Sequence, residues 1–245
     1  MKAMLFAAGL GTRLRPLTND RPKALVEAGG KPLLEIAIRR LMYFGFRDIV
    51  VNIHHFGQQV LDFLEANENF GANVFVSDER DMLLDTGGGL KKAAAFFRDA
   101  PFLVHNTDIL SNIDLGRFYE GHLHAAPLAT LSARQRQSSR YLLFDDEGRL
   151  AGWRNARTGE ERICRKVAHY HPLAFSGIYV LSPAIFEYMP TQAVFSIIDV
   201  FLEAGRTEKI VACRHDDALW LDVGRPAALE QAQEVVPKIE LARHR

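Results

Sequence analysis

The sequence is poor in cysteine and has no excess of charge of either sign. Its 245 residues include only Cys164 and Cys213, which form neither a disulfide framework nor a metal-ligand spacing. Thirty basic residues balance thirty acidic ones, so no overall field favours a nucleic acid or an anionic membrane as a partner. No apolar run approaches membrane-spanning length, and the first residues look like a strand rather than a signal peptide. We therefore expect a cytoplasmic protein.

Two widespread phosphate-binding motifs are also absent. A P-loop would need Ser or Thr after Gly30-Lys31, where Pro32 stands. The dinucleotide fingerprint would need a glycine where the chain has Leu14. A nicotinamide oxidoreductase is therefore not predicted.

Strand-like and helix-like segments alternate through the first half of the chain, as in a parallel α/β sheet. The apolar patterns predict strands at Lys2–Phe6, Ile49–Ile53, Asn73–Ser77 and Phe102–His105, and helices at Leu33–Phe44, Gln58–Glu65 and Gly88–Phe97. From about Leu128 short strands dominate. They are expected at Leu128–Ala133, Tyr141–Asp145, Arg149–Trp153, Ala174–Leu181, Lys209–Cys213 and Leu219–Asp222, with a helix at Ser196–Ala204 and a terminal helix that Pro226 opens and Pro237 ends or kinks.

The segment from Arg154 to Pro172 is polar and basic. Five cations (Arg154, Arg157, Arg162, Arg165 and Lys166) face two acids there. Either it is a solvated loop, or it is a flap near an anionic substrate such as a carboxylate-bearing sugar. The residues leave both interpretations open.

A glycine-rich turn follows the first predicted strand. Gly9 and Gly11 permit backbone angles and close approaches that a β-carbon hinders. Backbone N–H groups in such a turn can converge on an anion. Arg13, Arg15 and Lys23 bring positive charge to the same region. The segment is therefore suited to holding a polyphosphate, although a simple surface turn is the alternative.

The order Gly9-x-Gly11-Thr12-Arg13-x-x-Pro-Leu-Thr, with Pro-Lys23 downstream, resembles the signature of the sugar-1-phosphate nucleotidyltransferases. The chain looks most like the short bacterial members, of the mannose-1-phosphate guanylyltransferase and N-acetylmuramate-1-phosphate uridylyltransferase types. The resemblance implies a Rossmann-like three-layer α/β/α fold with a mixed, mostly parallel sheet and a small β-rich insertion. It also implies one catalytic domain, with a nucleotide-binding half (1–125), a sugar-binding half (126–224) and a C-terminal helix (225–245). No hexapeptide repeat indicates a β-helix domain.

The resemblance implies a Mg²⁺-dependent reaction between a nucleoside triphosphate and a sugar 1-phosphate, in a monomer or homodimer. Catalytic roles would fall to Arg13, Lys23 and Asp108, and nucleotide binding to Ala7, Ala8, Gly9, Gly11, Thr12, Arg13, Thr86, Gly87 and Gly88. Lys23, Asn106, Gly177 and Asp222 would bind the sugar phosphate. The alternative is a non-catalytic homologue that binds sugar nucleotides and regulates.

Three of these assignments have plain structural alternatives. Asp108 and Asp222 each end a predicted strand, where a carboxylate often only caps or turns the chain, yet as a pair they match the family's magnesium ligands. The glycines at 87–89 suit a nucleobase site or a flexible loop before a helix, and Gly177 suits a sugar pocket or a β-bulge. Thr107, where many relatives carry glycine, and Glu27, where many carry proline, depart from the family pattern.

Overall fold

The computed structural model describes residues 1–239, which pack into two compact units. The first unit comprises Met1–Leu83, Val104–Gly116 and the chain from Ala218 onward. The second comprises Leu84–Leu103 and Arg117–Asp217. The expected nucleotide and sugar halves (1–125 and 126–224) concern ligand binding and stay a prediction. Residues 240–245 of the expected C-terminal helix lie outside the described part.

Parallel strands form the centre of the first unit. β1 (Lys2–Phe6) pairs with β4 (Asp48–Ile53), which pairs with β5 (Asn73–Asp78). The strand order is β6-β1-β4-β5, where β6 (Phe102–Asn106) begins in the second unit. Thr107, which follows β6, donates its backbone N–H to the carbonyl of Phe6 at the end of β1. The segments that follow β1 and β6 are therefore neighbours.

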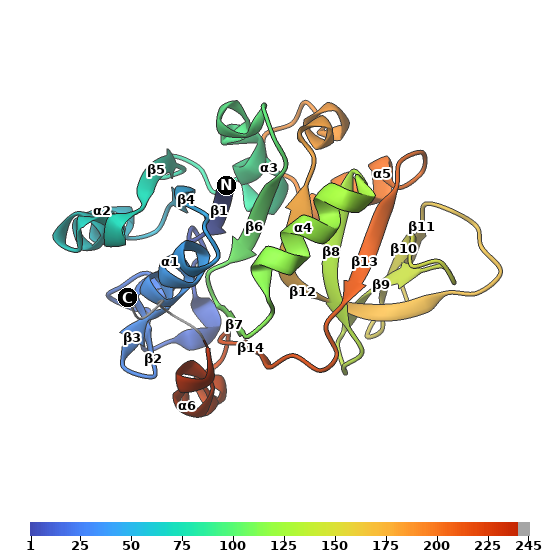
Figure 1. Cartoon of the computed structure of the whole chain (residues 1–245). Coiled ribbons are helices and arrows are strands. Elements are labelled where there is room, and N and C mark those ends of the chain that lie inside the picture. The colour runs from blue at the N-terminus through green and yellow to red at the C-terminus, as the bar shows by residue number, and fades with distance from the viewer. Residues whose placement is uncertain (240–245) are drawn as a thin grey trace. The chain divides into compact units, whose positions relative to one another are not determined.

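Two short antiparallel pairs complete the strands of this unit. β2 (Glu27–Ala28) pairs with β3 (Lys31–Pro32). β7 (Ile109–Ser111) pairs with β14 (Trp220–Asp222), although more than a hundred residues of chain separate them. The helices are α1 (Leu33–Tyr43), α2 (Gly57–Ala66) and α6 (Pro226–Val235), and α6 lies beside β2 (Figure 1).

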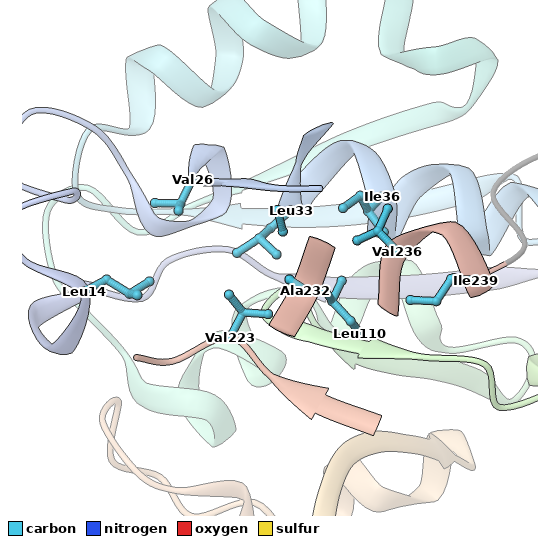
Figure 2. Close-up of a cluster of buried hydrophobic side chains, with 10 residues drawn as sticks. Leu14, Val26, Leu33, Ile36, Leu110, Val223, Ala232, Val236 and Ile239 are labelled. Carbon is cyan, nitrogen blue, oxygen red and sulfur yellow. The ribbon is translucent and has the colours of Figure 1, made fainter. Parts of the chain in front are cut away.

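One apolar cluster gathers the separate segments of the first unit. Its members are fully or nearly buried and come from the glycine-rich loop, α1, β7, the residue after β14, and the C-terminal helical turns (Figure 2). They are Leu14, Val26, Ala28, Leu33, Ile36, Leu110, Val223, Ala232, Val236 and Ile239. Burial of apolar surface is the main source of stability here. The cluster therefore fixes the loop, β7 and β14 to one support.

The second unit is mainly antiparallel. Its strands are β8 (Ala129–Arg134), β9 (Arg140–Phe144), β10 (Leu150–Asn155), β11 (Glu161–Ile163), β12 (His171–Leu181) and β13 (Ile210–Arg214), in the order β11-β10-β9-β12-β8-β13. Only the β8–β13 pairing is parallel among the pairs described within this unit.

Three helices accompany these strands. They are α3 (Asp85–Lys92), α4 (Leu115–Ala125) and α5 (Ile197–Ala204). Figure 1 shows α4 along β8, where His122 Nδ1 lies 2.9 Å from Thr130 Oγ1. Ser196 caps α5 by accepting a hydrogen bond from the N–H of Ile198.

The predicted fold class, a mixed α/β protein with parallel pairing at its core, is confirmed. Two local predictions need correction. α3 begins at Asp85 and already contains the glycine cluster, instead of starting at Gly88, and it ends at Lys92 before a 3₁₀ turn at Ala94–Phe97. α4 was not among the predicted helices. Within residues 1–239, no helix has the length and apolar character needed to cross a membrane.

Candidate active site

The first residues of the glycine-rich loop, directly after β1, are held in place by hydrogen bonds. The N–H groups of Ala7 and Ala8 donate to Asn52 Oδ1 at 2.7 and 3.2 Å. Asn52 is buried and lies near the end of β4. A Cβ added at Gly9 would meet no atom within 4 Å, so the protein itself does not require glycine there. This open space is consistent with the predicted close approach of a ligand.

At Gly11, in contrast to Gly9, the protein itself requires glycine. Its φ is +63°, and a Cβ there would lie 2.8 Å from Thr18 Cγ2 and 3.1 Å from Lys23 Cβ. Its carbonyl accepts hydrogen bonds from Leu14 N and Thr18 Oγ1, both at 2.8 Å. Thr12 and Arg13 then form the first residues of a 3₁₀ turn, Thr12–Leu14. The turn presents both side chains to solvent while Leu14 is buried.

The β7–β14 pairing brings the two predicted metal ligands together. Asp108 immediately precedes β7, and Asp222 ends β14 opposite Ile109. The N–H of Val223 donates to the Asp108 carbonyl at 2.9 Å. Val223 and Leu110, close to the two aspartates in the chain, belong to the buried apolar cluster. The backbone segments that carry the two carboxylates are therefore neighbours and are well anchored.

Lys23 reaches the same place from a different segment. Its ammonium forms an ion pair with Asp108 Oδ2. Both side chains are mostly buried, with 14% of Lys23 and 21% of Asp108 exposed. Lys23 opens the 3₁₀ turn Lys23–Leu25 directly after Pro22. The ion pair thus joins a predicted phosphate-binding cation to a predicted metal ligand.

Arg13 meets Asp222 at Gly224. A Cβ added at Gly224 would lie 2.7 Å from Arg13 Nη2 and 2.7 Å from Asp222 Oδ1. Both charged groups therefore lie against the glycine backbone, and a side chain at position 224 would have to displace them. Arg13, Lys23, Asp108 and Asp222 form one group of two cations and two anions within the first unit. We call these four residues the charged cluster.

The chain before Asp108 is anchored from within. Thr107 Oγ1 donates to the Phe6 carbonyl at 2.8 Å, which gives this side chain a structural role. Burial lowers the pKa of His105 to about 4, so its imidazole is neutral at physiological pH. His105 Nδ1 lies 2.8 Å from the Asn106 carbonyl. Asn106, a predicted sugar-phosphate residue, ends β6 in the same unit.

The predicted nucleobase residues belong to the second unit, where they make packing contacts. The N–H groups of Gly87 and Gly88 both point to the Phe195 carbonyl, at 2.9 and 3.3 Å. Thr86 Oγ1 accepts a hydrogen bond from the N–H of Ile197 at the start of α5. A Cβ at Gly87 would lie 2.4 Å from the Phe195 ring, and one at Gly88 only 2.0 Å from the Ala193 carbonyl. These glycines are required by the packing of α3; their role toward a base stays a prediction.

Gly177 also has a local structural reason. It has a φ of +78° where the register between β12 and β8 shifts, between Phe175 and Tyr179. This is the β-bulge that the sequence left open. Its part in sugar binding stays a prediction.

The basic segment is a hairpin arm rather than a free loop. β11 pairs with the end of β10, and three of the five cations have acidic partners. The pairs are Arg154–Glu161 at 2.6 Å, Arg162–Asp199 at 2.7 Å and Arg165–Asp145 at 3.0 Å. Since these charges are locally neutralised, the segment offers less positive charge to a substrate than its sequence suggests.

Sequence reasoning missed Asn52 and Glu79, whose side chains act far along the chain from the loop. It also gave no account of Glu27. That residue lines a surface pocket of about 440 Å³ beside the end of the signature segment. The other lining residues are Pro16, Leu17, Asp20, Arg21, Val26 and Leu229.

Comparison with known proteins shows the family of the chain. The family model described as "Nucleotidyl transferase" matches residues 2–238. N-acetylmuramate alpha-1-phosphate uridylyltransferase of Neisseria meningitidis serogroup B is 32% identical over 95% of this chain and 97% of its own length. The protein of the same name from Caulobacter vibrioides is 33% identical over 92% of this chain and 93% of its own.

Among solved structures, HddC from Yersinia pseudotuberculosis superposes with a TM-score of 0.76 at 25% identity. The match covers 95% of this chain and 98% of that one. The sequence relatives named above are sugar-1-phosphate nucleotidyltransferases, the class predicted from the signature. With its signature loop, charged cluster and fold accounted for over nearly the whole chain, the protein belongs to the nucleotidyl transferase family.

Proposed function

We propose that the protein joins a nucleoside triphosphate to a sugar 1-phosphate, releasing pyrophosphate and forming a nucleoside diphosphate sugar. The observation that carries this proposal is the charged cluster at the end of the glycine-rich loop. Family membership supports the reaction class. The intracellular compartment expected from the sequence, the cytoplasm, is part of the same proposal.

The sugar phosphate itself is the nucleophile in this proposal. One of its oxygens attacks the α-phosphorus, a new P–O bond forms, and the bond from the α-phosphorus to the bridging oxygen breaks as pyrophosphate leaves. A phosphate monoester has its second pKa near 6. The attacking oxygen is therefore largely ionised at neutral pH, and no general base is needed. The protein's task is alignment and charge neutralisation.

Arg13 and Lys23 divide this task. Arg13 is exposed at the rim of the loop, where its guanidinium can pair with the triphosphate and the departing pyrophosphate. Lys23 is held by Asp108 and is largely buried, so its ammonium is already mostly desolvated and oriented. A phosphate that enters the site competes with Asp108 for this cation. Lys23 then bridges the attacking and attacked phosphates.

Asp108 and Asp222 have the type of ligand atom that magnesium prefers. They supply hard carboxylate oxygens from adjacent strands, and Mg²⁺ takes one or two carboxylates together with phosphate oxygens and water. No group of three or more His, Cys, Asp or Glu side chains suited to a metal occurs in residues 1–239. In this proposal the remaining ligands come from substrate and water. When bound, the ion neutralises phosphate charge.

For the substrates we propose UTP and N-acetylmuramate α-1-phosphate. Two relatives that match more than nine-tenths of this chain and of their own lengths carry this activity in their names. The competing function, a regulatory homologue that binds sugar nucleotides without turnover, would require a disabled charged cluster, and all four residues are present.

The test is a matrix of substrates. Purified protein would be incubated with UTP, GTP, CTP, ATP or dTTP and a panel of sugar 1-phosphates, and the product identified by mass spectrometry. Formation of UDP-N-acetylmuramate above all other pairings supports both levels of the proposal. Formation of a different nucleotide sugar retains the reaction and overturns the substrates. Binding of a nucleotide sugar with no product from any pairing favours the regulatory function.

A further inference from the structure

Beneath the glycine-rich loop lies a pair of buried polar side chains that the proposed mechanism does not use. Asn52 is 2% exposed and lies near the end of β4, and Glu79 is 1% exposed and directly follows β5. Both belong to the first unit. Burying an amide and a carboxylate is costly unless their hydrogen bonds are made. Their contacts therefore show what the arrangement provides.

The side-chain amide of Asn52 forms hydrogen bonds both to the loop and to Glu79. Its Oδ1 accepts from two consecutive N–H groups, Ala7 at 2.7 Å and Ala8 at 3.2 Å, while its Nδ2 donates to Glu79 Oε1 at 2.7 Å. Backbone donors require the oxygen on one side, and the carboxylate requires the NH₂ on the other. Only one orientation of the amide satisfies both.

Glu79 is in turn fixed to the strand that carries Asn52. Its N–H donates to the Ile53 carbonyl at 2.8 Å, and its carbonyl lies 2.7 Å from His54 Nδ1. Glu79 therefore holds the Asn52 amide from a position tied to the end of β4.

We propose that Asn52 and Glu79 are a positioning pair that sets the peptide planes of Ala7 and Ala8 for nucleotide binding. Two consecutive N–H groups bonded to a single oxygen cannot rotate independently, so the chain enters Gly9 in one direction. The N–H groups of Ala7 and Ala8 are occupied by Asn52. A nucleotide therefore meets the carbonyls of these residues and the backbone from Gly9 onward. This inference rests on the proposed function, since it assumes that the nucleotide binds at this loop.

The experiment exchanges the two functional groups. Asn52→Asp alone places two carboxylates in contact, which repel each other unless they share a proton. Glu79→Gln alone keeps an oxygen that can accept from Asn52. The double variant Asn52→Asp/Glu79→Gln restores the hydrogen bond between positions 52 and 79 with donor and acceptor exchanged. The new amide at position 79 can donate to the new carboxylate at position 52, and that carboxylate can still accept from the loop. The second substitution should therefore restore the contact that Asn52→Asp alone disrupts.

We expect Asn52→Asp to raise the KM for the nucleotide about 10- to 100-fold, as for a misplaced binding group, with little change in the KM for the sugar phosphate. Its defect should shrink as the pH is lowered, because one shared proton relieves the repulsion. The double variant should return to within about threefold of the wild type, a residual that reflects incomplete equivalence of exchanged partners. Thr130→Val, which removes a buried hydrogen bond to His122 in the second unit, is the matched control. It should lower Tm without raising the nucleotide KM.

A second measurement is independent of turnover. Hydrogen exchange of the peptide containing Ala7 and Ala8 should accelerate in Asn52→Asp and recover in the double variant. Equal exchange in wild type, single and double variants overturns the positioning role. So does a single variant Asn52→Asp whose nucleotide KM is unchanged. If the wild type has no turnover, the proposed function fails, while the exchange data still decide whether the pair holds the loop.

Discussion

Lys23 and Asp108 are separated by 85 positions in the chain and form a largely buried ion pair. No residue near either one in the sequence indicates that the two would form an ion pair. Val26, three residues after Lys23, and Leu110, two residues after Asp108, pack in the same apolar cluster, which keeps the two segments together. In this protein, the position of the charges is therefore a consequence of hydrophobic packing.

Replacement of Gly224 should disable the cluster without disturbing the core. The Cβ of Gly224→Ala would contact Arg13 Nη2 and Asp222 Oδ1 at 2.7 Å, so the guanidinium must move. We expect kcat to fall about 10²-fold or more, comparable to loss of one preorganised electrostatic contact. Gly121→Ala, in α4, meets no atom within 4 Å and is the matched control. It should keep full activity and stabilise the protein by about 0.5–1 kcal/mol. Equal kcat values in both variants would contradict the assignment of Gly224.

Gly9→Ala separates ligand binding from stability. The added methyl group meets nothing in the protein within 4 Å, so Tm should stay within about 2 °C of the wild type, less than about 1 kcal/mol for a domain this size. If a nucleotide lies against this backbone, the methyl group occupies its space. Titration calorimetry should then show weaker nucleotide binding. Unchanged affinity would place the ligand elsewhere on the loop.

Leu14→Ala tests whether the apolar cluster supports the site. Leu14 is fully buried next to Arg13, and loss of its side chain should cost about 2–5 kcal/mol in the free energy of unfolding. Urea denaturation measures this cost. Leu123→Ala, at a position 48% exposed, should change the same quantity by less than about 0.5 kcal/mol. If both variants lost a similar amount of unfolding free energy, the apolar cluster would not be what supports the site.

Two buried histidines predict a loss of stability in acid. Burial lowers the pKa of His105 and that of His122 to about 4 in the folded protein. In the unfolded chain the pKa of histidine is about 6.5. Between these values the unfolded state binds more protons, so the free energy of unfolding falls as pH decreases from about 6.5 to about 4.

Urea denaturation at a series of pH values checks this dependence. His122→Gln removes one of these titrating groups, so its stability should vary less steeply with pH than that of the wild type. The same slope in variant and wild type would show that His122 does not contribute.

Much of the fold could be predicted because its strands and helices have clear apolar periods. β1, α1, β4 and α5 lie within one or two residues of the predicted bounds. α4 could not be found in this way. Its sequence contains Gly116, Gly121 and two histidines near its end, and its position depends on contacts such as that between His122 and Thr130.

The limits of sequence reasoning at the site are of the same kind. The signature pointed to Arg13 and Lys23, and the resemblance at two strand ends pointed to Asp108 and Asp222. The structure brings these residues together. The predicted helix began only at Gly88 and left Gly87 in the preceding loop, because glycine disfavours helices. The helix forms nevertheless, since only glycine permits the close packing against Phe195. Asn52 bonds to Ala7, which is 45 residues away in the sequence, and no local sequence pattern predicts such a contact.

The most direct test of the account is pyrophosphate release from UTP and N-acetylmuramate α-1-phosphate by the wild type and by Asp108→Asn. Asp62→Asn, at an exposed carboxylate on α2, is the control for loss of one charge. We predict release by the wild type and by Asp62→Asn, abolished by EDTA and restored by magnesium. Asp108→Asn should remain folded and lose about 10²-fold or more of the rate. Release that persists at the wild-type rate in Asp108→Asn, or that is indifferent to EDTA, would contradict the proposed role of the charged cluster.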